Sequence, residues 1–198
     1  MIFKGIELCC PDCRGDLTAV VSTAVSPEEW ACADCGRRYP VIAGIPDLRV
    51  FPDPYIEMEP DRDKGRMLAE AAATRTFPEL VDFYYQHTDV VPPQHARLYK
   101  RGLLAAEARS KSVLAAWQPS SGHLLDVGCG TGPMLAAAAA ADYRPVGVDI
   151  AFRWLVVGQR RLQDAGVDAP LICACAEALP FPDGAFTAVT AESVLEHV

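Results

Sequence analysis

The run LLDVGCGTGPML, residues 124–135, constrains the fold more than any other stretch of the chain. An apolar segment leads into glycine at every second position, Gly128, Gly130 and Gly132, and helix-forming residues follow. Glycine adopts positive φ readily and lets another group approach the backbone closely. The pattern therefore predicts a strand, then a loop that lies against a bound molecule, then a helix.

The spacing of this loop separates it from two nucleotide-binding loops. A Walker phosphate loop requires Lys and then Ser or Thr after its last glycine, whereas Pro133 and Met134 follow Gly132. The dinucleotide fingerprint GxGxxG, begun at Gly128, requires glycine at the position of Pro133. The loop thus excludes ATP hydrolysis and disfavours NAD.

Strand and helix patterns alternate from residue 121 onward. Apolar strands are expected in 123–130, 144–150, 169–176 and 186–193, with helices in 133–142 and 151–166. This alternation indicates an α/β fold with a Rossmann-like, doubly wound parallel sheet. Right-handed crossovers predict the first three strands in order and the fourth beside the first.

Composition divides the rest of the chain. Residues 1–50 are rich in cysteine pairs, 51–60 form a proline-rich acidic linker, 61–120 form a helical cap, and 121–198 form the α/β domain. Helices are expected in 61–75, 78–87 and 92–117. The packing stripe predicted for the last of these comprises Leu98, Arg101, Leu104, Ala105, Ala108 and Ser112.

Two CxxC pairs, Cys10 with Cys13 and Cys32 with Cys35, are separated by 18 residues. Two such knuckles supply the four tetrahedral sulfurs of a structural Zn(II) site, which would also stabilise a segment too small to build its own core. Cys9 is an alternative ligand to Cys10. A thioredoxin-like redox pair would instead lie near a βαβ unit, which this segment lacks.

Charge and hydropathy narrow the location and the partners. The net charge is −8, the isoelectric point is about 5.0, and no long Lys or Arg run occurs, so nucleic acid is not a favoured partner. The N-terminus has no secretory h-region, and no stretch is apolar enough to span a membrane. We therefore expect a cytoplasmic protein with reduced thiols and no membrane partner.

The segments LCCPDCRGDL and WACADCGRRYPVIAGIPDLRV, within residues 8–50, carry more than the cysteines. They resemble the small zinc-ribbon family that activates partner methyltransferases, the tRNA-methyltransferase activator subunits and their bacterial relatives. The resemblance implies a supporting module that covers apolar surface. Here it predicts an intramolecular contact between the ribbon and the α/β domain.

Four motifs in residues 124–198 occur in a characteristic order: LLDVGCGTG, RPVGVDI, AEALPFPDGAF and ESVLEHV. They resemble the class I S-adenosylmethionine-dependent methyltransferases of the type 11 group, whose fold has seven strands. Four strands are present here, so we expect the chain to be a fragment of a longer enzyme. The residues expected to bind the cofactor are Asp126, Gly128, Cys129, Gly130, Gly132, Asp149, Ile150, Ala176, Glu177 and Ala178.

Individual positions have their own chemistry. The glycine backbone and the following helix N-terminus would meet the methionine part of the cofactor, and Asp126 would orient its ammonium group or cap local N–H groups instead. Asp149 ends the second strand, where a carboxylate accepts both ribose hydroxyls, and Ile150 would pack on adenine. Cys175 stands where the family usually has an acid that holds the adenine amino group.

Methyl transfer requires mainly positioning, so catalysis leaves little trace in a sequence. His197 is a candidate base and equally a structural histidine; Glu192, Glu196, Tyr84 and Tyr85 are weaker candidates. The predicted function is methyl transfer to an unidentified acceptor, most simply a small molecule. The alternative is a noncatalytic zinc-ribbon scaffold that binds and activates a partner methyltransferase.

Overall fold

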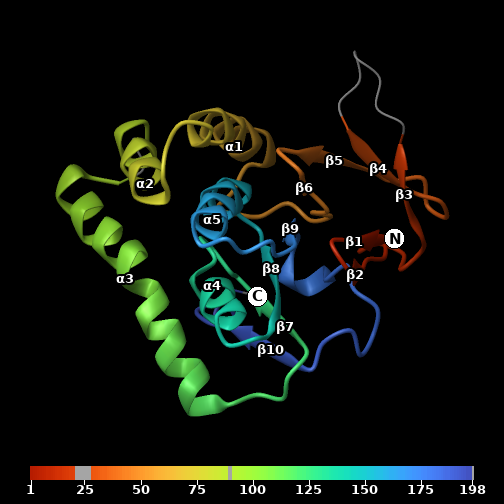
Figure 1. Ribbon diagram of the computed structural model, residues 1–198. Helices are drawn as coiled ribbons and strands as arrows, with labels where there is room; N and C mark the ends of the chain where they lie inside the picture. The colour runs from red at the N-terminus through yellow and green to blue at the C-terminus, as the bar shows by residue number, and fades with distance from the viewer. Residues whose placement is uncertain (21–27, 89–90, 198) are drawn as a thin grey trace.

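A four-stranded parallel sheet lies at the centre of the structure, between a helical layer and a cysteine-rich ribbon (Figure 1). The computed structural model describes residues 1–20, 28–88 and 91–197. The central strands are β7 (His123–Val127), β8 (Arg144–Asp149), β9 (Leu171–Cys173) and β10 (Ala188–Ala191). Their order, β10-β7-β8-β9, confirms the predicted fold class and strand order.

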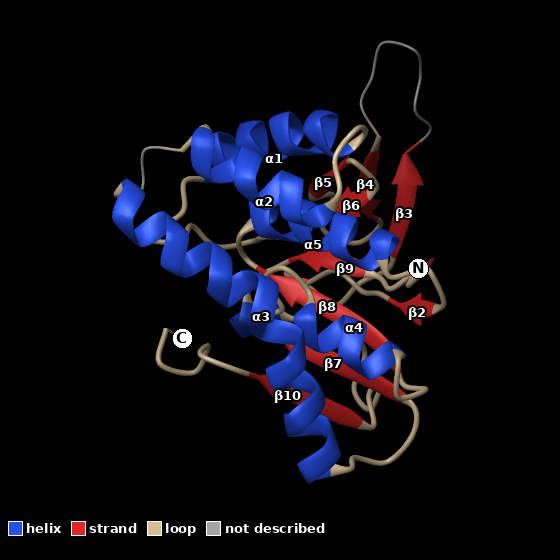
Figure 2. Ribbon diagram, turned by 60° about the vertical axis from the view of Figure 1, so that its left-hand side comes forward, coloured by secondary structure: helices blue, strands red, loops and turns tan. Residues whose placement is uncertain are grey.

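Two helices pack directly on one face of this sheet. They are α4 (Pro133–Ala139) and α5 (Phe152–Asp164), and both cross over between neighbouring strands in the same direction. Figure 2 shows them in front of the sheet, beneath the outer helices α1 (Met58–Ala72), α2 (Phe77–Gln86) and α3 (Pro93–Trp117). Thr76 and Glu79 form a capping box that starts α2.

The predicted packing stripe of α3 is wrong. Leu98 and Leu104 are exposed, and the side chains of α3 described as buried are Ala96, Ser110 and Leu114. Leu114 packs with Ala137 and Ala138 of α4. In a helix this rich in alanine, two neighbouring stripes satisfy the same three-to-four spacing, and contact with α4 selects one of them.

We call the described part of residues 1–50 the ribbon. It covers the opposite face of the sheet. A hairpin of β1 (Ile2–Phe3) and β2 (Ile6–Glu7) precedes an antiparallel sheet of β3 (Leu17–Val20), β4 (Glu29–Cys32), β5 (Arg38–Ile42) and β6 (Ile45–Pro46). Its apolar residues and those of the central sheet form one buried cluster. The members include Leu8, Trp30, Tyr39 and Leu48 from the ribbon and Leu125, Val146, Val148 and Ile172 from the sheet. This joint core is the intramolecular contact expected from the sequence.

The segment after β6 also covers an edge of the central sheet. Leu48 N donates to Cys173 O at 2.7 Å, and Asp47 forms a parallel bridge with Cys173. Figure 1 shows β6 beside β9. The outer edge of β9 is therefore occupied by backbone from the ribbon, which protects it from pairing with other chains.

The helices of the described residues include none that is both long enough and apolar enough to cross a membrane.

Close packing of α1 on α5 generates a first prediction. A Cβ built on Gly65 of α1 would overlap the ring of Phe152, whereas one built on Gly102 of α3 meets nothing within 4 Å. We expect Gly65→Ala to lower the free energy of unfolding by about 1–3 kcal/mol, because overpacking outweighs the better helix propensity of alanine. Gly102→Ala should raise it by about 0.5–1 kcal/mol. Urea unfolding measures both, and stabilisation by Gly65→Ala would contradict this packing.

Candidate functional site

The glycine loop has the backbone conformation that its spacing predicts. Gly128, Gly130 and Gly132 all have positive φ, at 72°, 51° and 71°. The N–H groups of Gly128 and Cys129 both donate to Val148 O, at 2.8 and 2.9 Å. The loop therefore folds back over the carboxyl end of β8, and any residue with a Cβ would be strained at these positions.

Asp149 joins this loop to the start of α5. Its Oδ2 accepts the Gly130 N–H at 2.8 Å, and its Oδ1 accepts the Ala151 N–H at 2.7 Å. Burial raises the pKa of Asp149 above its ordinary value, while these two N–H groups oppose the shift. A carboxylate has about four lone-pair sites, so two remain for a ligand.

A cavity of about 450 Å³ opens beside this carboxylate, at the carboxyl ends of β7, β8 and β9. Its volume lies within the range of about 300–1,000 Å³ that is typical of small-molecule sites. Residues after β10 also line it, so the cavity borders the point between β7 and β10 where the strand order reverses, the usual ligand position in an open α/β sheet. Of the predicted cofactor residues, those that line it are Gly128, Asp149, Ile150, Ala176 and Glu177.

Other predicted residues are not part of the cavity lining. The Cys129 side chain is buried in the core with Leu135, so it offers the site its backbone. Gly130 and Gly132 shape the loop, and Ala178 ends the short 3-10 turn η1 (Ala176–Ala178). Cys175 is buried, with its Sγ 3.9 Å from Phe51 O. None of these five is among the residues that line the cavity in the described parts of the chain.

Asp126 is buried beneath the loop. Its Oδ1 accepts a hydrogen bond from the Thr190 hydroxyl at 2.6 Å. Burial, together with the nearby charges of Asp149 and Glu192, raises its pKa to about 7, although the Thr190 hydrogen bond opposes the shift. Asp126 therefore changes its charge near neutral pH.

The weaker catalytic candidates separate in the structure. The exposed His197 lines the cavity, and Glu192 forms an ion pair with Arg109 of α3. Tyr84 is buried against Trp154, with ring centroids 4.5 Å apart. Trp154 rather than either tyrosine lines the cavity.

The cavity also contains residues that the sequence analysis missed. Asp53, Tyr55 and Ile56 come from the predicted linker, and Arg153 and Trp154 come from the first turn of α5. Arg153 and Trp154 follow Asp149 closely in the sequence, so their position could have predicted that they lie near the site. The linker residues carried no signal, because their place depends on how the ribbon docks.

The four predicted zinc ligands converge. The Sγ atoms of Cys10, Cys13, Cys32 and Cys35 lie within 4.8 Å of one another, with Cys10 and Cys35 at 3.8 Å and Cys13 and Cys32 at 3.4 Å. Tetrahedral Zn–S bonds of about 2.3 Å place sulfurs about 3.8 Å apart. All eight cysteines are free thiols, and Cys9 lies outside this group. The donor set and its spacing therefore fit Zn(II).

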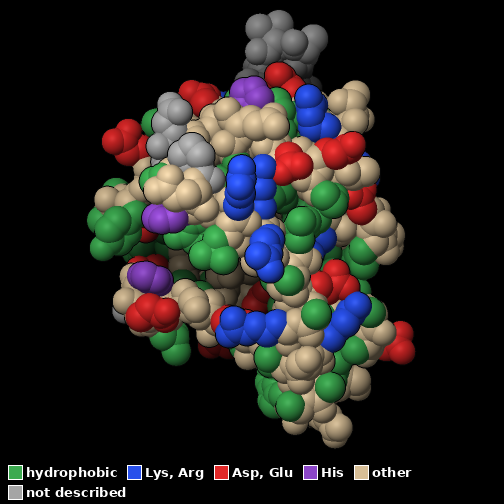
Figure 3. All heavy atoms as spheres, turned by 90° about the vertical axis from the view of Figure 1, so that its left-hand side faces the viewer, with side chains coloured by type: hydrophobic (Ala, Val, Ile, Leu, Met, Phe, Trp, Pro, Cys, Tyr) green, Lys and Arg blue, Asp and Glu red, His purple; other side chains and the backbone are tan. Residues whose placement is uncertain are grey.

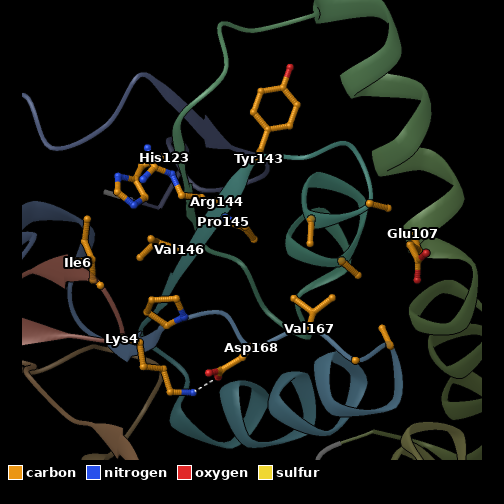
Figure 4. A pocket seen from close by; sticks show the side chains of 17 residues that line it. Lys4, Ile6, Glu107, His123, Tyr143, Arg144, Pro145, Val146, Val167 and Asp168 are labelled. Carbon is orange, nitrogen blue, oxygen red and sulfur yellow. Dashed lines mark hydrogen bonds and ion pairs between the residues drawn. The ribbon is translucent and has the colours of Figure 1, made fainter.

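A second cavity, of about 630 Å³, lies at the opposite ends of the strands (Figure 4). His123 and Arg144, which begin β7 and β8, lie at one side of it, and Glu107 of α3 lies at the other. Lys4 of the ribbon donates to Asp168 at 2.5 Å across it. This cavity is distant from the glycine loop and contains a contact between ribbon and domain.

Comparison with known families and proteins identifies the α/β part. Residues 125–198 match the family described as "Methyltransferase domain", Methyltransf_11. This confirms the resemblance predicted from the four motifs, and these residues carry a methyltransferase domain of that kind.

Relatives and solved structures match less than half of the chain. A demethylmenaquinone methyltransferase of Thermus thermophilus is 36% identical over 84 residues, which are 41% of this chain and 38% of that protein. A ubiquinone/menaquinone biosynthesis C-methyltransferase of Burkholderia mallei is 44% identical over 73 residues, 35% and 30% of the two chains. The alignment thus spans about a third of these relatives. The phosphoethanolamine N-methyltransferase 2 of Haemonchus contortus, solved with S-adenosyl-L-methionine, is 23% identical with a TM-score of 0.40, over 46% of this chain and 22% of that one.

The raised pKa of Asp126 generates a second prediction. Because the folded-state pKa of about 7 exceeds the unfolded value of about 3.9, ionising this group opposes folding as the pH rises from 4 to 8. Asp126→Asn removes that effect. We expect the difference in unfolding free energy between variant and wild type to shift by roughly 4 kcal/mol in favour of the variant over this range. Denaturant unfolding at both pH values measures it, and a pH-independent difference would contradict a protonated Asp126.

Proposed function

We propose that this chain binds S-adenosylmethionine between its glycine loop and Asp149, and that the protein transfers the methyl group to a small-molecule acceptor. The observation that carries the proposal is the hydrogen bond from Gly130 N to Asp149 Oδ2 beside the 450 Å³ cavity. This contact joins a positive-φ glycine loop to a strand-end carboxylate beside the cavity, which supports a site of this kind.

The residues present fit this cofactor. The unused lone pairs of Asp149 would accept the two ribose hydroxyls. Ile150 and Ala176 would bound the adenine, and ionised Asp126 would favour the ammonium group beneath the loop. The sulfonium supplies an electrophilic methyl group when bound, so the protein's own task is to orient the reactants and exclude water.

His197 would accept a proton from the acceptor. Its exposed side chain lines the same cavity as Asp149, at the end of the segment that follows β10. An imidazole in that place suits an acceptor with an acidic O–H, N–H or C–H group.

A small-molecule acceptor agrees with two observations. The aligned relatives are named for menaquinone and ubiquinone biosynthesis. On the face that carries α2 and α3, basic, acidic and hydrophobic side chains are interspersed (Figure 3), a mixture unlike the basic surface of a nucleic-acid binder.

The free thiols of the cysteine cluster favour a reducing compartment such as the cytoplasm.

The ribbon would be a structural zinc module. It shares its apolar core with the central sheet, which supports a role in stabilising the methyltransferase domain, as the resemblance to activator subunits implies. Zinc would contribute to folding, and the methyl-transfer chemistry would belong to the cavity at the carboxyl ends of the strands.

Calorimetric titration tests the cofactor proposal. We expect S-adenosylmethionine and S-adenosylhomocysteine to bind and NAD to give no heat. Asp149→Asn should weaken S-adenosylhomocysteine binding about 10- to 100-fold, because the amide offers one acceptor oxygen in place of two. Asp168→Asn, at the opposite end of the sheet, is the control. Silence with all three ligands would favour the scaffold function, and heat with NAD alone would favour an oxidoreductase.

Metal analysis tests the ribbon. We expect about one zinc per chain, lost in Cys35→Ser and retained in Cys9→Ser, with chelation lowering the melting temperature. Zinc content that falls in Cys9→Ser would show that Cys9 is a ligand. Wild-type chain that purifies without zinc and is indifferent to chelators would contradict a structural metal site.

A further inference from the structure

A cluster of buried charged residues lies where the ribbon meets the α/β domain. We call Asp47, Arg49, Asp61, Arg62 and Arg153 the joint cluster. Asp47 Oδ1 accepts Arg49 Nε at 2.9 Å, and its Oδ2 accepts Arg49 Nη2 at 2.6 Å and Arg62 Nε at 2.8 Å. The side chains of Asp47, Arg49 and Asp61 are at most 2% exposed.

Two members of the joint cluster hold the loop that presents Asp149. Arg49 Nη1 donates to Ile150 O and to Asp61 Oδ2, each at 3.0 Å. Asp61 Oδ2 also accepts the Phe152 N–H at 2.7 Å. The loop between β8 and α5 is therefore held at two backbone groups. Arg49 of the ribbon binds the Ile150 carbonyl, and Asp61 of α1 binds the Phe152 N–H.

Asp61 acts as the N-terminal cap of α5 from outside that helix. The residue at the cap position is Ala151, whose side chain cannot accept a hydrogen bond. Asp61 supplies the missing acceptor for Phe152, and its Oδ1 pairs with Arg153 Nη1 at 2.6 Å. The first turn of α5 thus depends on a carboxylate 91 residues earlier in the chain.

The same loop forms one wall of the cavity. Asp149, Ile150, Ala151 and Arg153 all line it, and Asp149 Oδ1 is fixed by the Ala151 N–H. A shift of the backbone at 150–152 would therefore move the carboxylate. Burying several charges is a poor way to gain stability compared with an apolar joint, so a positioning role explains the joint cluster better than adhesion alone.

We propose that Arg49 and Asp61 are positioning residues for the cofactor, through which the ribbon fixes the loop that presents Asp149 to the ribose. The inference rests on the proposed function, since it assigns these residues to the same site. Neither side chain lines the cavity, so both act through the backbone of residues 150–152.

The test compares two variants that both disturb Asp47. Arg49→Lys keeps the charge, but one ammonium cannot serve Asp47, Asp61 and Ile150 O in the same fork geometry. Arg62→Gln removes another partner of Asp47 and touches no atom of the loop. Calorimetry gives the dissociation constants of S-adenosylhomocysteine and its 2′-deoxy analogue for each variant.

We expect wild type to prefer the 2′-hydroxyl ligand about tenfold. Arg49→Lys should weaken S-adenosylhomocysteine binding about tenfold and abolish most of that preference, whereas Arg62→Gln should preserve both values. If Arg49→Lys fails to fold by circular dichroism, Asp61→Asn takes its place with the same expected loss of preference.

Each result that would contradict these expectations overturns a different proposal. An unchanged preference in Arg49→Lys or Asp61→Asn, or an equal loss in Arg62→Gln, would overturn the positioning role while leaving cofactor binding intact. No preference in wild type would overturn ribose recognition by Asp149 and this inference with it. No binding in wild type would overturn both proposals.

Discussion

The hydrogen bond between Gly130 N and Asp149 Oδ2 joins the ends of two neighbouring strands, and the site depends on it. It forms because left-handed backbone at three glycines turns the loop back over β8, and the carboxylate of Asp149 lies at the end of that strand. A side chain on any of those glycines would strain this turn. The cavity, the remaining lone pairs of Asp149 and the buried Asp126 are all arranged around that one contact.

The ribbon covers the face of the central sheet that α4 and α5 leave open. Both helices that cross over between β7, β8 and β9 lie on one face, so the other face of those strands would be bare without a cover. Trp30, Tyr39 and Leu48 provide it, and the segment after β6 closes the β9 edge. A module that resembles activators of separate enzymes is here packed on the domain within the same chain.

Local sequence patterns predicted much of this architecture. They did not predict contacts between segments that are far apart in the chain. The glycine spacing gave the loop conformation, and the alternation of strands and helices gave the strand order. The linker lining of the cavity and the capping of α5 by Asp61 depend on contacts between segments far apart in the chain, which no periodicity encodes. Thr190, which hydrogen bonds to Asp126, was likewise invisible because strand pairing brings the two together.

Amide hydrogen exchange with and without S-adenosylhomocysteine tests the central claim most directly. If the glycine loop and the strand-end carboxylate together hold the cofactor, the ligand should slow exchange at residues 128–132 and at 149–152 in the same titration. Unchanged exchange in both segments at saturating ligand, or slowing confined to the residues around the cavity of Figure 4, would contradict the account.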